Sequence, residues 1–277
     1  MDILQFLYET IPGRFLLKPL TSPRLSKLCG RFLDSSYSRF LIKPFVRRNA
    51  ICVSDYEISD IRSFNDFFSR KIYEEKRPIN MDEENLIAPC DGLLSVWRIE
   101  EDTVFPVKQS RYTVASLLRN RKLAARYKDG YCLVFRLCVH HYHRYCYVDS
   151  GEKSRNIVIP GRLHTVRPIA LRNVPVFTEN SREYTAIRTK KFGTVIQMEV
   201  GAMLVGRIVN YMGRGKVIRG KEKGCFQYGG STIILLLEPG QIQMREDILK
   251  SAVQGREVPV RMGEVIGHAS DEKKFTR

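Results

Sequence analysis

From about residue 86 onward, the chain is a succession of short β-like runs separated by clusters of Gly, Pro, Asn and Asp. Such runs are rich in Val, Ile and aromatic residues and are bounded by turn formers, which is typical of strands. The expected strands are 93–96, 131–139, 157–159, 194–200, 203–209, 233–237 and 258–260. Helical patterns between them are scarce, with 114–127 as the main exception. The pattern therefore predicts an antiparallel β-rich domain.

The N-terminal part of the chain has a helical pattern instead. Residues 1–50 carry nine Lys or Arg against three acidic residues, and their apolar side chains recur at helical spacing. Pro12-Gly13 interrupts the first apolar stripe, and Ser22-Pro23 is typical of an N-cap followed by Pro at the first helical position. Another helix is expected within 61–80.

These two patterns together predict an α+β protein. We expect N-terminal amphipathic helices over residues 1–80, followed by an antiparallel β-rich domain over 81–277. Basic amphipathic helices can lie in a membrane interface, and they can equally pack on the protein's own core. The helical segment alone leaves both interpretations open.

Composition excludes several classes of protein. Hydrophobic residues make up 43% and charged residues 27% of the chain, which is not the composition of a disordered protein. No apolar run approaches the roughly 18–20 residues that span a bilayer, and the N-terminus does not resemble a secretory signal. The seven Cys include no C-x-x-C pair, which favours reduced thiols over disulfides or a zinc site. The net charge of +16 favours anionic partners.

Gly229-Gly230-Ser231-Thr232 leads directly into the apolar run 233–237. A glycine turn before a buried strand is an ordinary structural feature. Glycines also permit strained backbone conformations, in which the Ser231 hydroxyl can turn onto the preceding carbonyl carbon. Such a serine needs a base to become nucleophilic, and the developing oxyanion needs hydrogen-bond donors.

Three of the five histidines stand close together, at 140, 141 and 143. On a strand, His141 and His143 would share one face and His140 would lie on the other. The cluster could supply a base, bind zinc, or be a set of surface polar residues at a strand end. No Cys/His pair with the usual zinc spacing stands elsewhere, so no metal site is expected.

Pro89-Cys90-Asp91-Gly92 places an acid in a tight turn. Pro and Asp-Gly are ordinary turn residues. The functional alternative is that Asp91 orients a histidine, as in serine–histidine–aspartate sites.

Seven motifs together resemble the phosphatidylserine decarboxylases, and they follow that family's order over nearly the whole chain. The layout is similar to the short bacterial form. The motifs are FNDFFSRK (64–71) with RPI (77–79), PCDG (89–92), YHR (142–144), FTENSR (177–182), VGAMLVGRI (200–208), KEKGCF (221–226) and GGST (229–232).

The resemblance implies a self-cleaving proenzyme with a covalent pyruvoyl (pyruvate) cofactor. Ser231 would attack the Gly230 carbonyl, and elimination and hydrolysis would then release ammonia and convert Ser231 to the pyruvoyl group. The products would be a long chain, 1–230, and a short chain, 231–277, which stay together. A Schiff base with phosphatidylserine would then act as an electron sink, giving phosphatidylethanolamine and CO2 without a metal.

The resemblance also implies roles for individual residues. Asp91 matches the acid of the self-cleaving site, Ser231 the nucleophile, and His143 a histidine that acts as base, acid or both. Family members often carry a second histidine where this chain has Cys146. A free thiol, with a pKa of about 8.5, is a poor base near pH 7. The alternative bases are His140, His141 and Cys146.

A lipid substrate implies contact with a membrane. We expect residues 1–50 to bind an anionic membrane surface, with the protein peripheral on the cytoplasmic face of the cell membrane. We also expect a homo-oligomer and no nucleic-acid partner. Two other functions remain open: a pyruvoyl-dependent decarboxylase of a soluble amino acid, and an uncleaved, inactive homologue that binds membranes.

Overall fold

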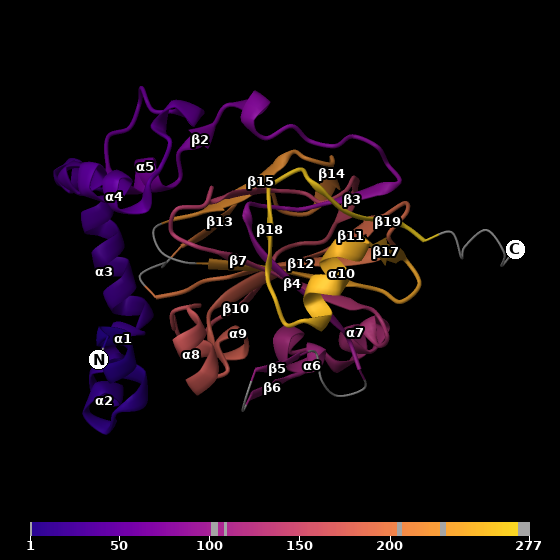
Figure 1. Ribbon diagram of the computed structural model, residues 1–277, viewed down its shortest axis with the longest axis horizontal. Coiled ribbons are helices and arrows are strands. Elements are labelled where there is room, and N and C mark those ends of the chain that lie inside the picture. Colours follow the sequence, from indigo (N-terminus) through magenta and orange to yellow (C-terminus); the bar gives the residue numbers. More distant parts are fainter. Residues whose placement is uncertain (1, 101–104, 108–109, 204–206, 228–230, 271–277) are drawn as a thin grey trace, which may run out of the picture.

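N-terminal helices stand along one side of a large antiparallel sheet (Figure 1). The computed structural model describes residues 2–100, 105–107, 110–203, 207–227 and 231–270. The N-terminal helices are α1 (Ile3–Glu9), α2 (Ile11–Leu20), α3 (Pro23–Asp34), η1 (Ser36–Leu41) and α4 (Ile42–Asn49). The later helices are short: η2 (Val53–Asp55), α5 (Phe64–Phe68), η3 (Glu74–Lys76), α6 (Val114–Leu118), α7 (Arg121–Ala124), η4 (Ala125–Tyr127), α8 (Pro168–Asn173), α9 (Val176–Glu179) and α10 (Glu246–Val253). The fold is α+β, as the sequence predicts.

Side-chain caps determine where the first helices begin. The Thr10 hydroxyl accepts a hydrogen bond from Gly13 N at 3.0 Å. Pro12 and Gly13 therefore lie in the first turn of α2, where Pro is tolerated, instead of interrupting a helix. A Cβ at Gly13 would lie 1.9 Å from a backbone oxygen of α1, so the close approach of α1 and α2 requires glycine. Ser22 caps α3 with Pro23 in its first turn, which confirms the predicted helix start.

Within the described residues, the large sheet has nine strands in the order β14-β9-β11-β12-β16-β7-β4-β18, with β10 also paired to β11. β16 lies between β12 and β7, and hydrogen-bonded ladders on both sides bury all of its residues. The strands are β4 (Gly92–Arg98), β7 (Tyr131–Leu137), β9 (Gly151–Lys153), β10 (Ile157–Ile159), β11 (Arg182–Thr189), β12 (Thr194–Val200), β14 (Gly215–Val217), β16 (Ser231–Leu237) and β18 (Val258–Val260).

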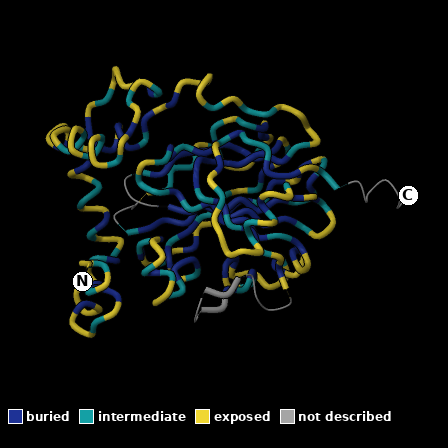
Figure 2. The backbone as a smooth tube through the Cα atoms, viewed as in Figure 1, coloured by how far each residue is buried: buried dark blue, intermediate teal, exposed yellow. Residues whose placement is uncertain are grey.

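Side chains on the two faces of β16 pack into separate cores. Ile233 and Leu235 belong to a core that includes residues of α1, α2 and α10. Ile234 and Leu236 belong to a second core with residues of α6 and α9. This alternation is expected for a strand that is buried on both faces. Figure 2 shows the buried sheet interior in dark blue and many exposed positions in the N-terminal helices in yellow.

Smaller sheets pack around the large one. The first, in the order β13-β15-β8, contributes Tyr145 and Phe226 to the core on the Ile233 face. Its strands are β8 (Arg144–Cys146), β13 (Ile208–Asn210) and β15 (Glu222–Phe226). The others are formed by β3 (Asn85–Ile87), β19 (Val265–Ala269) and β17 (Ile242–Met244), by β1 (Tyr56–Glu57) and β2 (Lys71–Ile72), and by β5 (Phe105–Val107) and β6 (Ser110–Tyr112).

The expected strands are found, with differences at their ends. The prediction of 194–200 coincides with β12, whereas the run 203–209 forms a strand only from Ile208, and 204–206 lie outside the described residues. The helix expected within 61–80 is wrong in extent. It ends at Phe68 because Lys71–Ile72 pair with Tyr56–Glu57 as strands.

Candidate active site

Asp91 and Ser231 lie at the same edge of the large sheet, on either side of β7. Ser231 begins β16 opposite Leu137, the last residue of β7. Asp91 immediately precedes β4, whose Leu93 pairs with Arg136 of β7. Neighbouring strands lie about 4.8 Å apart, so two spacings separate the two backbones by roughly 10 Å. The loop that leaves β7 at this edge carries the three clustered histidines.

Ser231 is completely buried, and its Oγ has no hydrogen-bond partner within the described residues. By strand alternation its side chain lies on the face of Ile233, which β15 and β8 also cover. A buried hydroxyl without a partner costs about 1–3 kcal/mol, and nothing in the described residues offsets that cost at Ser231. The expected cleavage partner, Gly230, lies outside the described residues, as does Gly229.

His143 is a neutral imidazole with an unused acceptor nitrogen. Its Nδ1 donates to the carbonyl of His141 at 2.8 Å, which leaves the lone pair on Nε2. This Nε2 is buried and has no partner among the described residues. Burial, assisted by the nearby charge of Arg70, lowers the pKa of His143 to about 3. The Phe68 ring covers the imidazole at 4.1 Å between centroids. An imidazole in this state can accept a proton.

His141 closes the turn that follows β7. The Cys138 N–H donates to His141 Nδ1 at 3.0 Å, so the His141 proton resides on Nε2. Burial, together with the adjacent His140, lowers the pKa of His141 to about 4, and the charge of Asp91 opposes this shift. Asp91 therefore acts electrostatically on His141. His140 is exposed and makes an edge contact with the His141 ring.

Asp91 is held by an arginine. Arg77 donates to both carboxylate oxygens, from Nε at 2.7 Å and from Nη2 at 2.5 Å, and Met262 N donates at 2.9 Å. The Arg77 and Asp91 side chains are only 14% and 7% exposed, so water screens this pair weakly. Among the described residues, Asp91 makes no hydrogen bond to a histidine. The carboxylate is thus fixed at the sheet edge where Ser231 lies, without a direct Asp–His contact among the described residues.

Cys146 is unsuited to proton transfer. Burial raises the pKa of its thiol to about 12, so the thiol stays protonated at neutral pH. Its backbone N donates to Pro89 O at 2.9 Å, which anchors β8 beside the turn that contains Asp91. Cys146 also lines a cavity of about 660 Å³, together with Arg77, Tyr142 and Met262.

A family model described as phosphatidylserine decarboxylase matches residues 64–268, well over half of the chain. The chain belongs to the phosphatidylserine decarboxylase family. It is 47% identical over 270 residues to "Phosphatidylserine decarboxylase proenzyme 2" of Clostridium acetobutylicum, covering 97% of this chain and 92% of that protein. Over 277 residues it is 37% identical to "Phosphatidylserine decarboxylase proenzyme" of Ruminiclostridium cellulolyticum, covering 98% and 92%. A Clostridium beijerinckii protein of the same name is 38% identical over 270 residues, covering 95% and 91%.

Three residues in the phosphatidylserine decarboxylase motifs have contacts at this edge that the sequence did not reveal. Phe68 lies against His143, and Arg77 holds Asp91. Asn180 donates to the backbone oxygens of His164 and Gly201, at 2.8 and 2.7 Å. The motifs include these three residues and so could have marked them as candidate site residues, but the sequence did not indicate which groups they contact. Within the described part of the chain, no group of three His, Cys, Asp or Glu side chains could hold a metal ion.

The Asn180 contacts connect the N-terminal helices of this family member to the sheet edge where Ser231 lies. Gly201 follows β12, whose last residue pairs with Thr232 of β16, so Gly201 lies beside Ser231. On the other side, the Tyr8 hydroxyl of α1 lies 3.3 Å from His164 Nδ1. Tyr8 is only 2% exposed. Hydrogen bonds thus run from α1 through His164 and Asn180 to the strand next to Ser231.

Proposed function

We propose that this chain is the proenzyme of a phosphatidylserine decarboxylase whose reactive carbonyl is made from Ser231. The observation that carries the proposal is a pair of buried groups at one sheet edge, Ser231 Oγ and His143 Nε2, neither of which has a hydrogen-bond partner among the described residues. One is a potential nucleophile and the other a potential base. The His143 carbonyl accepts from Phe226 N at 2.9 Å, which ties the histidine to the segment that leads into Ser231.

The chain's own groups suffice for the proposed self-cleavage. Ser231 Oγ loses its proton to His143 Nε2 and attacks the Gly230 carbonyl carbon. The bond from that carbon to the Ser231 nitrogen then breaks, so the amide becomes an ester and the nitrogen takes up a proton. Elimination then removes the Cα proton of residue 231 to a base and breaks its Cβ–O bond, which frees the Gly230 carboxylate and leaves a carbon–carbon double bond at residue 231. Water then displaces the nitrogen as ammonia, and no oxidant is consumed.

The same residues support the decarboxylation of phosphatidylserine to phosphatidylethanolamine and CO2. A pyruvoyl group at residue 231 supplies a carbonyl that binds the substrate amine and accepts the electrons left by CO2. His143 Nε2, which carries the lone pair of the neutral imidazole, would take up the proton that the reaction consumes and deliver it to the carbon that loses CO2. The carbonyl of His141 fixes the imidazole tautomer through Nδ1, and Phe68 shields the imidazole from water.

The short chain proposed to begin at Ser231 would remain in place after cleavage. Its first strand, β16, is hydrogen-bonded to β7 and β12, both of which belong to the long chain. Its later strands also pair with the long chain, β18 with β4 and β19 with β3. The two products are thus parts of one folded protein.

Exposed apolar side chains on the N-terminal helices support a substrate that resides in a bilayer. Among the described residues no helix is both long enough and apolar enough to cross a membrane. The exposed side chains suit helices that lie on an anionic surface, because Lys and Arg accompany them. They are Ile3, Ile11, Phe15, Leu16, Leu28, Phe32, Tyr37 and Phe40.

The intact mass of the purified protein under denaturing conditions tests the self-cleavage. We expect two chains divided after Gly230, with the short chain lighter by one ammonia than a peptide that begins with Ser231. The Ser231→Ala variant should give one full-length chain. A single full-length chain from the unaltered protein would contradict the proposal. Release of CO2 from free serine, but not from phosphatidylserine vesicles, would contradict the lipid substrate.

Co-sedimentation with phosphatidylserine vesicles tests the membrane surface. The triple variant Phe15→Ser/Leu28→Ser/Phe40→Ser should lose most vesicle binding, because these side chains are 66%, 63% and 66% exposed. Val253→Ser is the control, since Val253 is 90% exposed on α10, away from the N-terminal helices. Equal binding by the triple variant and the control would rule out this surface.

A further inference from the structure

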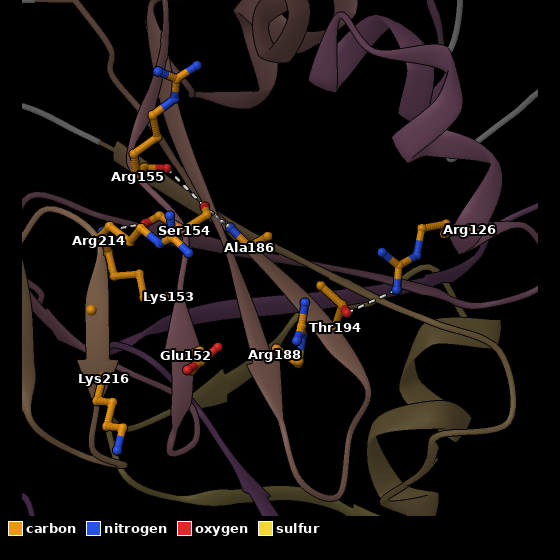
Figure 3. A pocket seen from close by; sticks show the side chains of 11 residues that line it. Arg126, Glu152, Lys153, Ser154, Arg155, Ala186, Arg188, Thr194, Arg214 and Lys216 are labelled. Carbon is orange, nitrogen blue, oxygen red and sulfur yellow. Dashed lines mark hydrogen bonds between the residues drawn. The ribbon is translucent and has the colours of Figure 1, made fainter.

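A basic groove lies at the end of the large sheet opposite Ser231 (Figure 3). Its volume is about 650 Å³, and Thr194, the first residue of β12, forms part of its wall. Ser231 lies near the other end of β12, roughly 20 Å away at about 3.3 Å per residue. The charged residues of its lining are Arg126, Lys153, Arg155, Arg188, Arg214, Lys216 and Glu152.

Four exposed cations of the groove have no anionic partner among the described residues. Arg155, Arg188, Arg214 and Lys216 are exposed, and none makes an ion pair with a described residue. Glu152 stands opposite both Arg188 and Lys216 in the strand ladders, but it forms no ion pair with them. Like charges gathered in a concave site repel one another and concentrate anions from solution.

The groove is held in shape by a buried lysine. Lys153 is 2% exposed, and its Nζ donates to the backbone oxygens of Ser154, Met212 and Gly213 at 3.2, 3.0 and 2.7 Å. Met212 and Gly213 directly precede Arg214. The lysine therefore fixes the segment before Arg214 relative to β9, so the backbone that presents Arg214 is in place before a ligand binds.

We propose that this groove binds a phosphorylated small molecule from solution that carries a chain of two or three phosphates. One guanidinium group can donate two parallel hydrogen bonds to two oxygens of a phosphate, and this geometry favours phosphate as the anion. Arg188 lies on β11 and Arg214 directly precedes β14, so the two guanidinium groups come from different segments and can contact successive phosphates. A volume of 650 Å³ lies within the 300–1,000 Å³ typical of ligand pockets and exceeds the needs of one phosphate ion.

A lipid headgroup is a poorer occupant. Figure 1 shows β14, which lines the groove, on the half of the molecule away from α1–α3, and α7, which directly precedes the turn that carries Arg126, lies on the same half. The groove is therefore separate from the helices whose exposed apolar side chains are the proposed membrane surface. This proposal does not rest on the proposed decarboxylase activity, because ligand binding to the groove can be measured without any catalytic turnover.

Isothermal titration of the full-length protein in 150 mM salt tests the proposal, with sodium tripolyphosphate and ATP as separate ligands. We expect saturable one-to-one binding of at least one of them. Arg188→Gln/Arg214→Gln should weaken it at least tenfold, and Glu152→Gln should strengthen it severalfold by removing a repelling carboxylate. The control is Arg62→Gln/Arg256→Gln, which removes the same net charge from two exposed positions outside the groove.

Tighter binding of ATP than of tripolyphosphate would support a nucleotide as the ligand, and equal binding would support recognition of the phosphate chain alone. The absence of saturable binding by both ligands would overturn the proposal. Equal weakening by the control pair would also overturn it, because that result means non-specific attraction. Loss of vesicle binding in Arg188→Gln/Arg214→Gln, without any ATP or tripolyphosphate binding, would instead assign the groove to a membrane.

Discussion

The Arg77–Asp91 ion pair allows a quantitative prediction about the free energy of unfolding of the protein. Arg77→Ala would leave the buried Asp91 carboxylate with Met262 N as its remaining hydrogen-bond donor in the described structure. Removing one partner of a buried ion pair costs about 3–5 kcal/mol. Because Arg77 retains 14% exposure and Met262 N remains, we expect a loss of about 3 kcal/mol in the free energy of unfolding.

Urea denaturation in a Ser231→Ala background measures this loss, because that background keeps the chain intact. Lys76→Ala is the adjacent control. Lys76 contacts Asp55 at 3.2 Å, but the two side chains are 46% and 30% exposed, so its loss should cost about 1 kcal/mol or less. Arg77→Ala/Asp91→Ala should be more stable than Arg77→Ala alone, because the uncompensated charge is gone. An equal or lower stability of the double variant would refute this account of the pair.

Three further predictions concern the histidines and the N-terminal helices. His143→Asn should abolish detectable self-cleavage while the chain stays folded, as read from chain mass and circular dichroism, and normal cleavage would exclude His143 as the base. The pKa values of His141 and His143 are lower in the folded chain than in the unfolded chain, so as the pH falls the unfolded chain takes up protons before the folded one does. The free energy of unfolding should therefore be at its full value above about pH 6.5 and decline toward pH 4. A urea midpoint that is equal at pH 7 and pH 5 would contradict this. Tyr8→Phe should reduce the rate of decarboxylation in vesicles, because it removes the hydroxyl that contacts His164, and an unchanged rate would show that this contact has no role.

Local patterns predicted the elements whose signals lie within a single turn or a single apolar run, and they missed others. Ser22 and Pro23 predicted the start of α3 because both act within a single turn. The run 233–237 predicted the central strand because it is uniformly apolar, as β16 is uniformly buried. β11 was missed because half-buried and polar residues interrupt its apolar ones, so Arg182–Thr189 has no clean period.

The candidate site was only partly predictable. Asp91, His143 and Ser231 were identified from motifs, and the sheet register brings Asp91 and Ser231 to one edge. The sequence could not show that Arg77 holds Asp91, or that the lone pair of His143 resides on Nε2. Both facts depend on the folded positions of distant segments and on backbone carbonyls, which leave no trace in residue spacing.

The central position of β16 determines the stage of folding at which the proposed self-cleavage can occur. Ser231 reaches its buried place only when β7 and β12 have both paired with β16. The segments that supply these strands lie far apart in the chain, so their pairing is a late, non-local event in folding. A misfolded chain would therefore remain an inert precursor, and the appearance of the cut would itself report that the sheet has been completed.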